Sequence, residues 1–364
     1  MKILFASPYG GVPGGITRWT EHILNYYHQS KPIGIEVDLL PMGRKSFVNI
    51  NSSIFYRLKC AVRDYGGILK EFKEKIKSTQ YDVMHLASSA SISLLKDIYM
   101  LRYAQKKGIK TCIHFRFGRI PELKRQNNWE WRLIKKVVLL ADKTIVLDKT
   151  SYEELKNSGF NNVALLPNPV APIVNQIVLN NTDIKREPNT LLFTGHVVKT
   201  KGVFELIDAC NNIPNIKLKM IGHVEPLMKE TLQARCKHSE QVKITGEMPY
   251  EEVIKEMLRC DIFVLPTYTE GFPNVILESM ACGCAIVTTK VGAIPEMLQE
   301  EGEKKFGILI DPQNEQQLQN AILTLLQDKA LKEQCKKNVR QRVIERYSID
   351  RIWTQLTHIW ESTK

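Results

Sequence analysis

The segment with the richest chemistry is PTYTEGFPNVILESMACGCAIV, residues 266–287. A polar turn carries Glu270 and Gly271, and Pro273 follows at a position that favours the first turn of a helix. The start of a helix offers backbone N–H groups and the positive end of the helix dipole. These groups suit an anion or the hydroxyl groups of a sugar, so this turn is a candidate binding site.

Glu278 lies inside the same predicted helix, among small and apolar residues. A buried carboxylate is rare without partners. A pair of vicinal hydroxyl groups would be a suitable partner, because a carboxylate accepts several hydrogen bonds. A solvated or capping glutamate is the alternative interpretation.

Two further glycine-containing loops each follow a short apolar run. The loop after 190–194 holds Gly195, His196, Lys199, Lys201 and Gly202, and a lysine at a helix start can meet a phosphate. The loop after 2–6 holds four glycines, more than a simple turn needs. Neither loop matches a Walker A sequence or G-x-G-x-x-G. Solvated lysines and a flexible turn are the alternatives.

Two histidines, His85 and His114, fall at the ends of apolar runs in the first half of the chain. A structural role is the more common one for such a histidine, and His114 is the better candidate for chemistry because Arg116 and Arg119 follow it. The chain shows no H-E-x-x-H, D-x-D or G-x-S-x-G pattern. We therefore expect no metal site and no serine nucleophile.

These residues must be positioned by alternating strands and helices, which predict an α/β fold with parallel, doubly wound sheets. In such sheets ligands bind outside the carboxyl ends of the strands. The alternation stops at a proline- and asparagine-rich stretch and then restarts, which predicts two domains in series. We expect an N-terminal domain over 1–170, a linker over 171–188, a C-terminal domain over 189–345, and a helix over 346–364 that packs back on the N-terminal domain. The predicted strands are 2–6, 35–40, 82–86, 109–115, 143–147, 163–166, 190–194, 216–221, 242–244, 262–265, 285–288 and 308–310. The predicted helices are 16–28, 54–77, 92–107, 129–140, 151–157, 202–211, 225–236, 250–258, 274–282, 315–327 and a helical tail over 329–362.

Composition excludes several classes of protein. The 364 residues are 43% hydrophobic and 25% charged, which argues against a disordered or low-complexity chain. No run approaches the ~20 apolar residues of a membrane span. The N-terminus reads as a first strand and not as a signal peptide. Eight cysteines without a C-x-x-C pair fit reduced thiols, so we expect a cytoplasmic protein.

The excess of positive over negative charge is confined to the first half of the chain. Residues 1–180 hold 27 Lys and Arg against 14 Asp and Glu, and the remainder holds 24 against 25. Aromatic residues interleave with the basic ones in 44–77, which is typical of a surface for nucleic acid or for an anionic membrane. A solvated lysine-rich face is the alternative. The asymmetry favours an anionic partner for the first half.

Taken together, these motifs resemble the retaining glycosyltransferases of the GT-B fold, specifically glycosyltransferase family four (glycosyl transferases group 1). The most specific part is EGFPNVILESMACGCAIV, with two glutamates eight positions apart ahead of Ala-Cys-Gly. The glycine pair at Gly14 and Gly15, His114, and the glycine and lysine pattern of 195–202 fall in the expected order. The resemblance implies two Rossmann-like domains that face each other across a cleft.

The resemblance also implies roles for individual residues. Glu278 would hold the donor ribose, Glu270 would lie at the donor sugar, and Lys201 would neutralise the diphosphate. His114 would face the donor sugar near the reacting carbon. The implied catalytic residues are thus Glu270, His114 and Lys201, and the implied donor-binding residues are Gly15, Gly195, His196, Lys201, Glu270, Gly271, Phe272, Asn274, Val275 and Glu278. The family usually has arginine where His196 stands.

Such enzymes need no metal or cofactor, and a nucleoside diphosphate sugar, with UDP or GDP preferred, is the expected co-substrate. The N-terminal domain of this fold binds the acceptor, so the basic aromatic surface predicts docking on an anionic membrane leaflet to glycosylate a glycan or a lipid-linked acceptor. The expected process is surface polysaccharide or glycolipid biosynthesis. The residues expected on the acceptor or membrane surface are Arg44, Lys45, Arg57, Lys59, Arg63, Arg116 and Arg119.

Three alternatives remain from the sequence. A sugar-nucleotide epimerase on the same scaffold would convert its substrate without an acceptor. A nucleic-acid-binding protein would use the basic half, although no helix-turn-helix, zinc or RNA-binding signature is present. A non-catalytic relative of the transferases is the third.

Overall fold

A computed structural model describes residues 1–10, 14–43, 54–298 and 304–364, with the backbone alone for 54–62. The chain forms two compact units, which we describe separately. The first unit comprises residues 1–168 and 352–364, and the second comprises 169–351. Among the described residues, no helix combines the length and the apolar composition that a membrane crossing needs.

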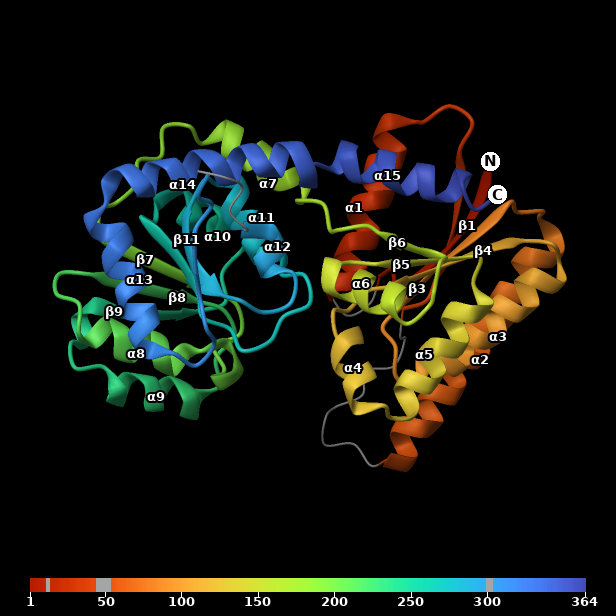
Figure 1. Ribbon diagram of the computed structural model, residues 1–364, viewed down its shortest axis with the longest axis horizontal. Helices are drawn as coiled ribbons and strands as arrows, with labels where there is room; N and C mark the ends of the chain where they lie inside the picture. The colour runs from red at the N-terminus through yellow and green to blue at the C-terminus, as the bar shows by residue number, and fades with distance from the viewer. Residues whose placement is uncertain (11–13, 44–53, 299–303) are drawn as a thin grey trace. The chain divides into compact units, whose positions relative to one another are not determined.

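The first unit is built on a parallel sheet of six strands in the order β2-β1-β3-β4-β5-β6 (Figure 1). The strand order reverses between β1 and β3, so the chain leaves these neighbouring strands in opposite directions along the sheet. Such a switch point opens a crevice at the carboxyl ends of the strands. The strands are β1 (Lys2–Ser7), β2 (Glu36–Pro41), β3 (Val83–Ser88), β4 (Lys110–Phe115), β5 (Lys143–Val146) and β6 (Val163–Leu165).

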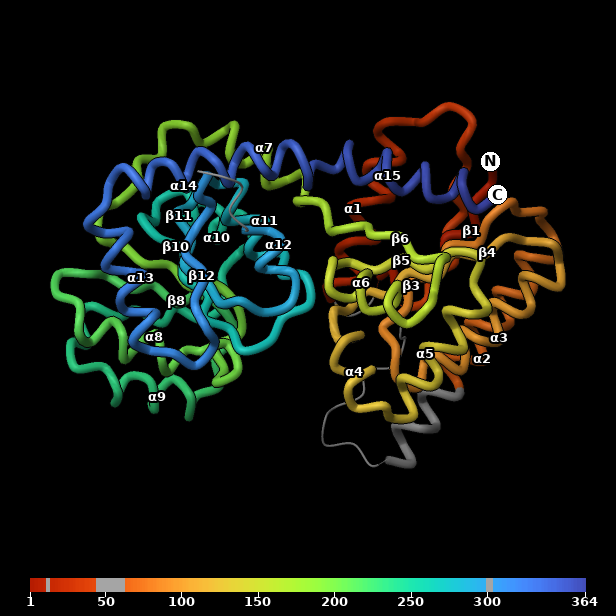
Figure 2. The backbone as a smooth tube through the Cα atoms, viewed as in Figure 1, coloured from red at the N-terminus to blue at the C-terminus, as the bar shows by residue number. Residues whose placement is uncertain are grey.

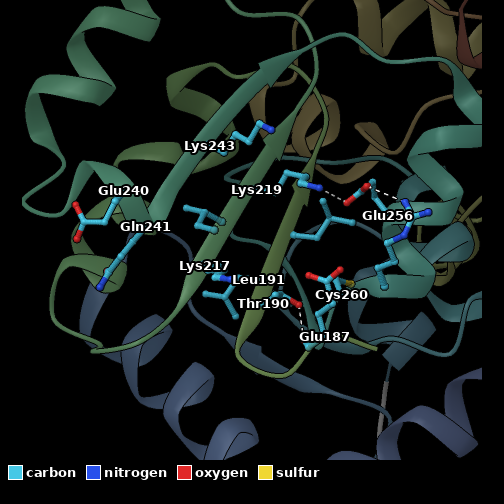
Figure 3. A pocket seen from close by; sticks show the side chains of 13 residues that line it. Glu187, Thr190, Leu191, Lys217, Lys219, Glu240, Gln241, Lys243, Glu256 and Cys260 are labelled. Carbon is cyan, nitrogen blue, oxygen red and sulfur yellow. Dashed lines mark hydrogen bonds and ion pairs between the residues drawn. The ribbon is translucent and has the colours of Figure 1, made fainter. Parts of the chain in front are cut away.

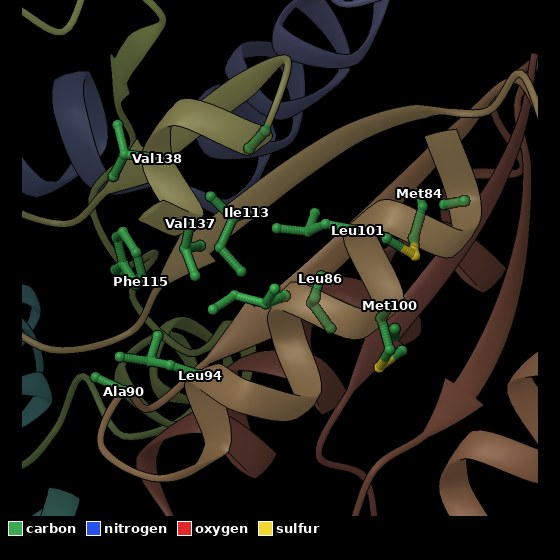
Figure 4. Close-up of a cluster of buried hydrophobic side chains, with 14 of the residues drawn as sticks. Met84, Leu86, Ala90, Leu94, Met100, Leu101, Ile113, Phe115, Val137 and Val138 are labelled. Atoms are coloured by element: carbon green, nitrogen blue, oxygen red, sulfur yellow. The ribbon is translucent and has the colours of Figure 1, made fainter. Parts of the chain in front are cut away.

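Helices cover this sheet on both faces, and three of them, α2, α3 and α5, lie side by side (Figure 2). Their apolar faces meet the sheet in one core, where side chains of β3 and β4 interdigitate with those of α3 and α5 (Figure 4). The burial pattern of β3 and β4 is nearly continuous because helices cover both faces. The helices are α1 (Gly15–Ser30), α2 (Ile54–Ser78), α3 (Ser93–Lys106), α4 (Ile120–Gln126), α5 (Trp129–Leu140) and α6 (Lys149–Asn157).

The second unit repeats the doubly wound plan with the order β12-β11-β10-β7-β8-β9, again all parallel. Counted within the unit, this is the Rossmann order, and the switch point lies between β7 and β10. The strands are β7 (Thr190–Thr194), β8 (Lys217–Ile221), β9 (Val242–Gly246), β10 (Ile262–Leu265), β11 (Ala285–Thr289) and β12 (Ile308–Ile310). The helical segments are α7 (Pro172–Asn180), η1 (Lys199–Lys201), α8 (Val203–Asn211), α9 (Pro226–Arg235), η2 (Ser239–Gln241), α10 (Tyr250–Arg259), α11 (Asn274–Ala281), α12 (Ile294–Leu298), α13 (Glu315–Gln327), α14 (Lys329–Arg342), the π-helix η3 (Val343–Tyr347) and α15 (Ile349–Glu361).

The segment predicted as a linker, 171–188, instead folds into the second unit. Its helix α7 buries Val174, Ile177 and Val178 and packs on α10 and α11. Pro172 stands in the first turn of α7, where proline is favoured, so it starts a helix here and does not interrupt one.

Arg186, from the same segment, caps the ends of two helices at once. Its guanidinium donates four hydrogen bonds of 2.6 to 3.1 Å to carbonyl groups at the carboxyl ends of α10 and α11. A cation is favoured at that end of a helix, where the last carbonyl groups have no partner within the helix. The four acceptors are Met257, Cys260, Cys282 and Gly283.

The C-terminal helix α15 begins in the second unit, and its residues from Ile352 onward belong to the first. Trp353 lies 5.7 Å from the ring of Tyr26, and Trp360 lies 6.2 Å from the ring of Phe5. Both tryptophans are buried, so these last residues complete the core of the first unit.

Candidate functional site

In the second unit, the predicted residues Lys201 and Glu270 lie at the switch point. Lys201 ends the 3-10 turn η1 after β7, and Glu270 belongs to the loop that follows β10. The structure brings the two together as an ion pair between Nζ of Lys201 and Oε1 of Glu270. Both side chains are only partly covered, with 26% and 14% of their surfaces exposed. A cation and a carboxylate therefore stand within reach of solvent at the end of the sheet where such folds bind ligands.

Two glycines force these loops into close contact. A Cβ at Gly202 would lie 2.0 Å from the carbonyl oxygen of Pro266, and Gly202 has a φ of +70°. A Cβ at Gly292, with a φ of +54°, would lie 2.3 Å from the carbonyl oxygen of Glu270. The amide of Ala293 also donates to the carbonyl of Gly271 at 2.9 Å. Backbone packing thus fixes the loop that carries Glu270 from both sides.

Glu278 lies in the second turn of α11, the helix that opens after Pro273. Its side chain is half-buried, and its Oε1 accepts a 2.8 Å hydrogen bond from the hydroxyl of Tyr250, the first residue of α10. Asn274 and Val275 form the first turn of α11, and the preceding Phe272 is buried against Tyr347. The predicted donor-binding segment is therefore one continuous loop and helix start at the carboxyl end of β10.

The glycine loop after β7 has a steric reason as well. Gly195 has a φ of +140°, a region that only glycine adopts readily, and the Cβ of any larger residue at Gly222 would lie 2.0 Å from its carbonyl oxygen. His196 is exposed and its ring lies 6.1 Å from that of His223. Gly195 and His196 thus lie at the same end of the sheet as Lys201.

A pair of hydrogen bonds from Tyr268 supports this loop. The amide of Tyr268 donates to the carbonyl of Thr200, and its hydroxyl donates to Glu205 at 2.6 Å. Burial and the hydrogen bond to Glu205 raise the pKa of Tyr268 to about 12, so the phenol stays protonated. This pair ties the loop after β10 to the start of α8.

In the first unit, the glycine loop ends at the start of α1. Gly14 and Gly15 are exposed, and a Cβ on either would meet nothing within 4 Å among the described atoms. The first turn of α1 has no acidic residue and no side-chain cap. A hydrogen bond of 2.6 Å between the hydroxyl groups of Ser7 and Thr20 anchors α1 to the end of β1. Among the described atoms, the start of α1 is thus an exposed helix terminus at the positive end of the helix dipole.

His114 lies in β4 with its side chain fully buried, as does His85 in β3. Nδ1 of His114 lies 3.3 Å from Nε2 of His85, and its Nε2 lies 3.1 Å from a guanidinium nitrogen of Arg116. Burial, and secondly the charge of Arg116, lower the pKa of His85 to about 3 and the pKa of His114 well below its usual range. Both imidazoles are therefore neutral at physiological pH.

The residues predicted on the acceptor surface divide into three groups. Arg44 and Lys45 lie outside the described residues, and for Arg57 and Lys59 only the backbone in α2 is described. Two others are surface cations, Arg63 with 72% and Arg119 with 47% of the side chain exposed. Arg116 differs from the prediction, because it is half-buried and stacks 4.1 Å above the ring of Trp19.

A hollow of about 190 Å³ opens elsewhere in the second unit, at the amino ends of β7 and β8 (Figure 3). Lys217, Lys219, Glu240 and Glu256 are among the residues that line it, and it contains no predicted site residue. Because ligands of doubly wound folds bind at the carboxyl ends, it is not the predicted donor site. Within the described part of the chain, no three metal-ligating side chains gather in one place.

Sequence reasoning missed two participants of the site. Tyr250 and Tyr268 carry no motif, and their partners Glu278 and Glu205 lie 28 and 63 residues away. Only the strand order of the second sheet, which no local pattern reveals, brings these residues to the site.

Known glycosyltransferases are similar to this chain in sequence. Residues 176–342 match the model of the family described as glycosyl transferases group 1. The chain is 27% identical over 329 residues to a Campylobacter jejuni enzyme, N-acetylgalactosamine-N,N'-diacetylbacillosaminyl-diphospho-undecaprenol 4-alpha-N-acetylgalactosaminyltransferase, with 84% of this chain and 86% of the relative covered. It is 28% identical over 203 residues to the capsular polysaccharide biosynthesis glycosyltransferase CapM of Staphylococcus aureus, half of each chain.

Solved structures agree on the fold. Sucrose-phosphate synthase from Thermosynechococcus elongatus aligns with a TM-score of 0.76 and 18% identity, over 99% of this chain and 98% of that one. Anabaena HepE in complex with UDP and glucose aligns with a TM-score of 0.68 and 18% identity over the whole of both chains. The family model and the curated relatives, together with the fold of these structures, define a glycosyltransferase of the GT-B fold. The glycosyl transferases group 1 model matches just under half of the chain, and this match agrees with the family-four pattern that the motifs resemble.

Proposed function

We propose that this glycosyltransferase transfers a sugar from a nucleoside diphosphate sugar to a lipid-linked or glycan acceptor, with retention of configuration and without a metal ion. The observation that carries the proposal is the group at the carboxyl end of the second sheet: the pair of Lys201 and Glu270, with Glu278 on the following helix. These residue types match the three parts of such a donor, its diphosphate, its sugar and its ribose.

In this proposal each residue contacts a different part of the donor. Glu278, held by the hydroxyl of Tyr250, accepts hydrogen bonds from the ribose hydroxyl groups. The backbone amides of Gly271 and Phe272, and those of Asn274 and Val275 at the start of α11, meet the sugar hydroxyl groups and a phosphate. Lys201 leaves its ion pair with Glu270 for the diphosphate, so Glu270 becomes available to the donor sugar.

Electrostatics then favours departure of the nucleoside diphosphate. The leaving group gains negative charge as the bond to the sugar breaks. Lys201 and the start of α11 place positive charge where that charge develops, which stabilises the transition state. A side-chain cation of this kind supplies the role that a divalent ion has in other transferases, and this supports the proposal of metal independence. His114 is proposed as a further residue that contacts the donor sugar.

The acceptor proposal rests on the first unit and on one relative. The name of the Campylobacter jejuni enzyme describes an undecaprenyl-diphosphate-linked acceptor. On the first unit, Ile92, Leu95 and Tyr99 are exposed along α3, and the ammonium of Lys73 on α2 lies 5.2 Å from the ring of Tyr99. Exposed apolar side chains beside cations suit a membrane with anionic lipids.

Co-sedimentation with vesicles tests the membrane part. Vesicles that contain a quarter phosphatidylglycerol should bind the protein, and 0.5 M salt should release it, because each basic residue contributes roughly 1 kcal/mol of screened attraction. Replacing Leu95 and Tyr99 by serine should weaken binding without changing nucleotide affinity. Equal binding to neutral vesicles would contradict the proposal.

Donor binding is tested by thermal shift with UDP, GDP, ADP, CMP and dTDP in EDTA. A ligand at 100 times its dissociation constant stabilises a protein by about 2.7 kcal/mol, which a melting curve detects. We expect a shift with one nucleotide, UDP or GDP, that EDTA leaves unchanged. Loss of that shift in EDTA, with recovery on added magnesium, would contradict metal independence.

A further inference from the structure

Arg116 is a half-buried cation without an anionic partner. Its guanidinium donates to Oδ1 of Asn168 at 2.6 Å and stacks on Trp19, and among the described residues no carboxylate forms an ion pair with it. Its Nε is buried and finds no acceptor, and the same is true of Nε1 of Trp19. Burial lowers the pKa of Arg116 to about 9, which reflects how poorly this environment compensates the charge.

Behind Arg116, three contacts between side-chain nitrogen atoms form a chain that has too few hydrogen-bond acceptors. Nε1 of Trp360 lies 3.0 Å from Nδ1 of His85, Nε2 of His85 lies 3.3 Å from Nδ1 of His114, and Nε2 of His114 lies 3.1 Å from Arg116. The indole and the guanidinium at the two ends can only donate. Each neutral imidazole between them carries one N–H and one acceptor nitrogen.

Those hydrogens cannot satisfy all three contacts. Trp360 donates to Nδ1 of His85, so the proton of His85 is on Nε2 and points to Nδ1 of His114. If the proton of His114 is on Nδ1, it faces this N–H of His85. If it is on Nε2, His114 accepts from His85 but faces an N–H of Arg116 at 3.1 Å. Two donors meet with no acceptor between them, and protonation of either imidazole would add another donor. The cluster lacks one acceptor.

The missing acceptor would lie where a substrate arrives. Arg116 directly follows β4, at the carboxyl edge of the sheet, and Trp19 lies in the second turn of α1, whose open start lies at the same edge. The surroundings are cationic and donor-rich, and a neutral hydroxyl group would leave the charge of Arg116 uncompensated. An anionic oxygen can accept from Arg116 and from Nε2 of His114 at once.

We propose that Arg116 and His114 form a subsite for an anionic substrate group, a carboxylate or a phosphate, so that the enzyme selects a charged sugar or a phosphate-linked acceptor. The inference rests on the proposed function and narrows its substrate class. Arg116 binds the anion, Trp19 holds the plane of its guanidinium, and the pair of histidines directs an N–H toward the same oxygen. Trp360 acts as a positioning residue because its indole sets which nitrogen of each histidine carries the proton.

Binding of matched probes to the intact protein tests the subsite and separates the two sources of the anion. The donor arm compares UDP-glucuronate with UDP-glucose, in which a hydroxymethyl group stands in place of the carboxylate. UDP is the reference. The acceptor arm compares geranyl diphosphate with geraniol. Each ligand is titrated calorimetrically into the wild type, Arg116→Met and, as a control that removes a charge from an exposed position in α4, Arg125→Met.

We expect the wild type to prefer the charged member of one arm by about 10- to 100-fold, the range for a hydrogen bond to a charged group. Arg116→Met should abolish that preference, while UDP affinity stays within twofold and Arg125→Met behaves as the wild type. Preference in the donor arm identifies a sugar carboxylate, and preference in the acceptor arm identifies an acceptor phosphate. Arg116→Lys, which keeps the charge without the planar fork, should retain part of the preference if the methionine variant does not fold.

The inference is overturned if neither arm shows a preference that depends on Arg116, or if Arg116→Met weakens UDP, UDP-glucose and UDP-glucuronate equally. The proposed function fails separately if UDP and the other nucleotides do not bind, and the isoprenyl arm still decides the inference in that case. Trp360→Phe gives a second readout, because His85 can then change tautomer and Nε2 of His114 can accept from Arg116. The preference should fall at least threefold in this variant, and not in Trp353→Phe.

Discussion

The carboxylate of Glu278 gives the most quantitative test of the donor site. In the proposed complex it accepts two hydrogen bonds from the ribose while Oε1 keeps its 2.8 Å bond from Tyr250. Glu278→Gln keeps the shape of the side chain but replaces one acceptor oxygen by an NH2 donor. Hydrogen bonds to a charged group contribute about 1.5–3 kcal/mol each. Losing one such bond and weakening the other should cost about 2–4 kcal/mol of donor affinity.

That cost corresponds to a dissociation constant for the nucleotide roughly 30- to 1,000-fold higher, at about 1.4 kcal/mol per tenfold change. Isothermal titration with the free nucleoside diphosphate measures it directly. Tyr250→Phe removes only the hydroxyl that positions the carboxylate and should cost less, about tenfold. Since the ribose is remote from the reacting bond, both variants should raise KM more than they lower kcat.

The test depends on which of the two variants binds the nucleotide more weakly. If Glu278→Gln binds nucleotide within threefold of the wild type, the carboxylate does not hold the ribose and the assignment of the site is wrong. If Tyr250→Phe is the more damaging variant, the hydroxyl itself contacts the ligand and Glu278 is its support. Melting temperatures of both variants show whether the fold is retained.

Three further predictions follow from single contacts. Gly15→Ala adds a methyl group that meets nothing within 4 Å among the described atoms and should raise stability by up to about 1 kcal/mol. The same change should lower turnover at least tenfold if a ligand approaches this backbone, and unchanged turnover would refute that approach. Burial raises the pKa of Asp148, so its ionised form destabilises the fold at neutral pH. Asp148→Asn keeps the helix cap and should raise the free energy of unfolding at pH 7, with a gain that shrinks as the pH falls toward 3.8. A gain that does not depend on pH in denaturant titrations would contradict this. Arg186→Met leaves four carbonyl groups at two helix ends without their cation and should lower the free energy of unfolding in urea by at least about 3 kcal/mol. The control Lys185→Met, at an exposed position, should lower it by less than about 0.5 kcal/mol.

Most of the architecture could be predicted from local patterns. Apolar strands that are buried on both faces alternate with amphipathic helices, and the twelve predicted strands appear as β1 to β12 with bounds that differ by a few residues at most. The patterns failed where a short helix has no clear period. The helices α4, α7 and α12 were missed because each begins beside a proline that resembles a loop signal.

The candidate site was predicted in part, and the limit has a physical reason. Motifs located the loops that hold Lys201 and Glu270, since glycines and a helix start have local signatures. The ion pair between these two residues joins positions 69 apart, and it depends on β7 and β10 being neighbours. Arg116 looked like a surface cation by composition. Its burial depends on Trp19 and on a histidine chain that ends at Trp360, the far end of the sequence.

The central claim is that this chain transfers a sugar to an acceptor. The most direct measurement incubates the protein with UDP- and GDP-sugars in EDTA, with and without a short isoprenyl-diphosphate-linked sugar, and follows both nucleoside diphosphate release and the mass of the acceptor. We predict release that requires the acceptor, equals the amount of extended product, and falls at least 100-fold in Lys201→Ala. Conversion of the nucleotide sugar without an acceptor would indicate an epimerase, and the absence of any product with every donor would contradict the transferase assignment.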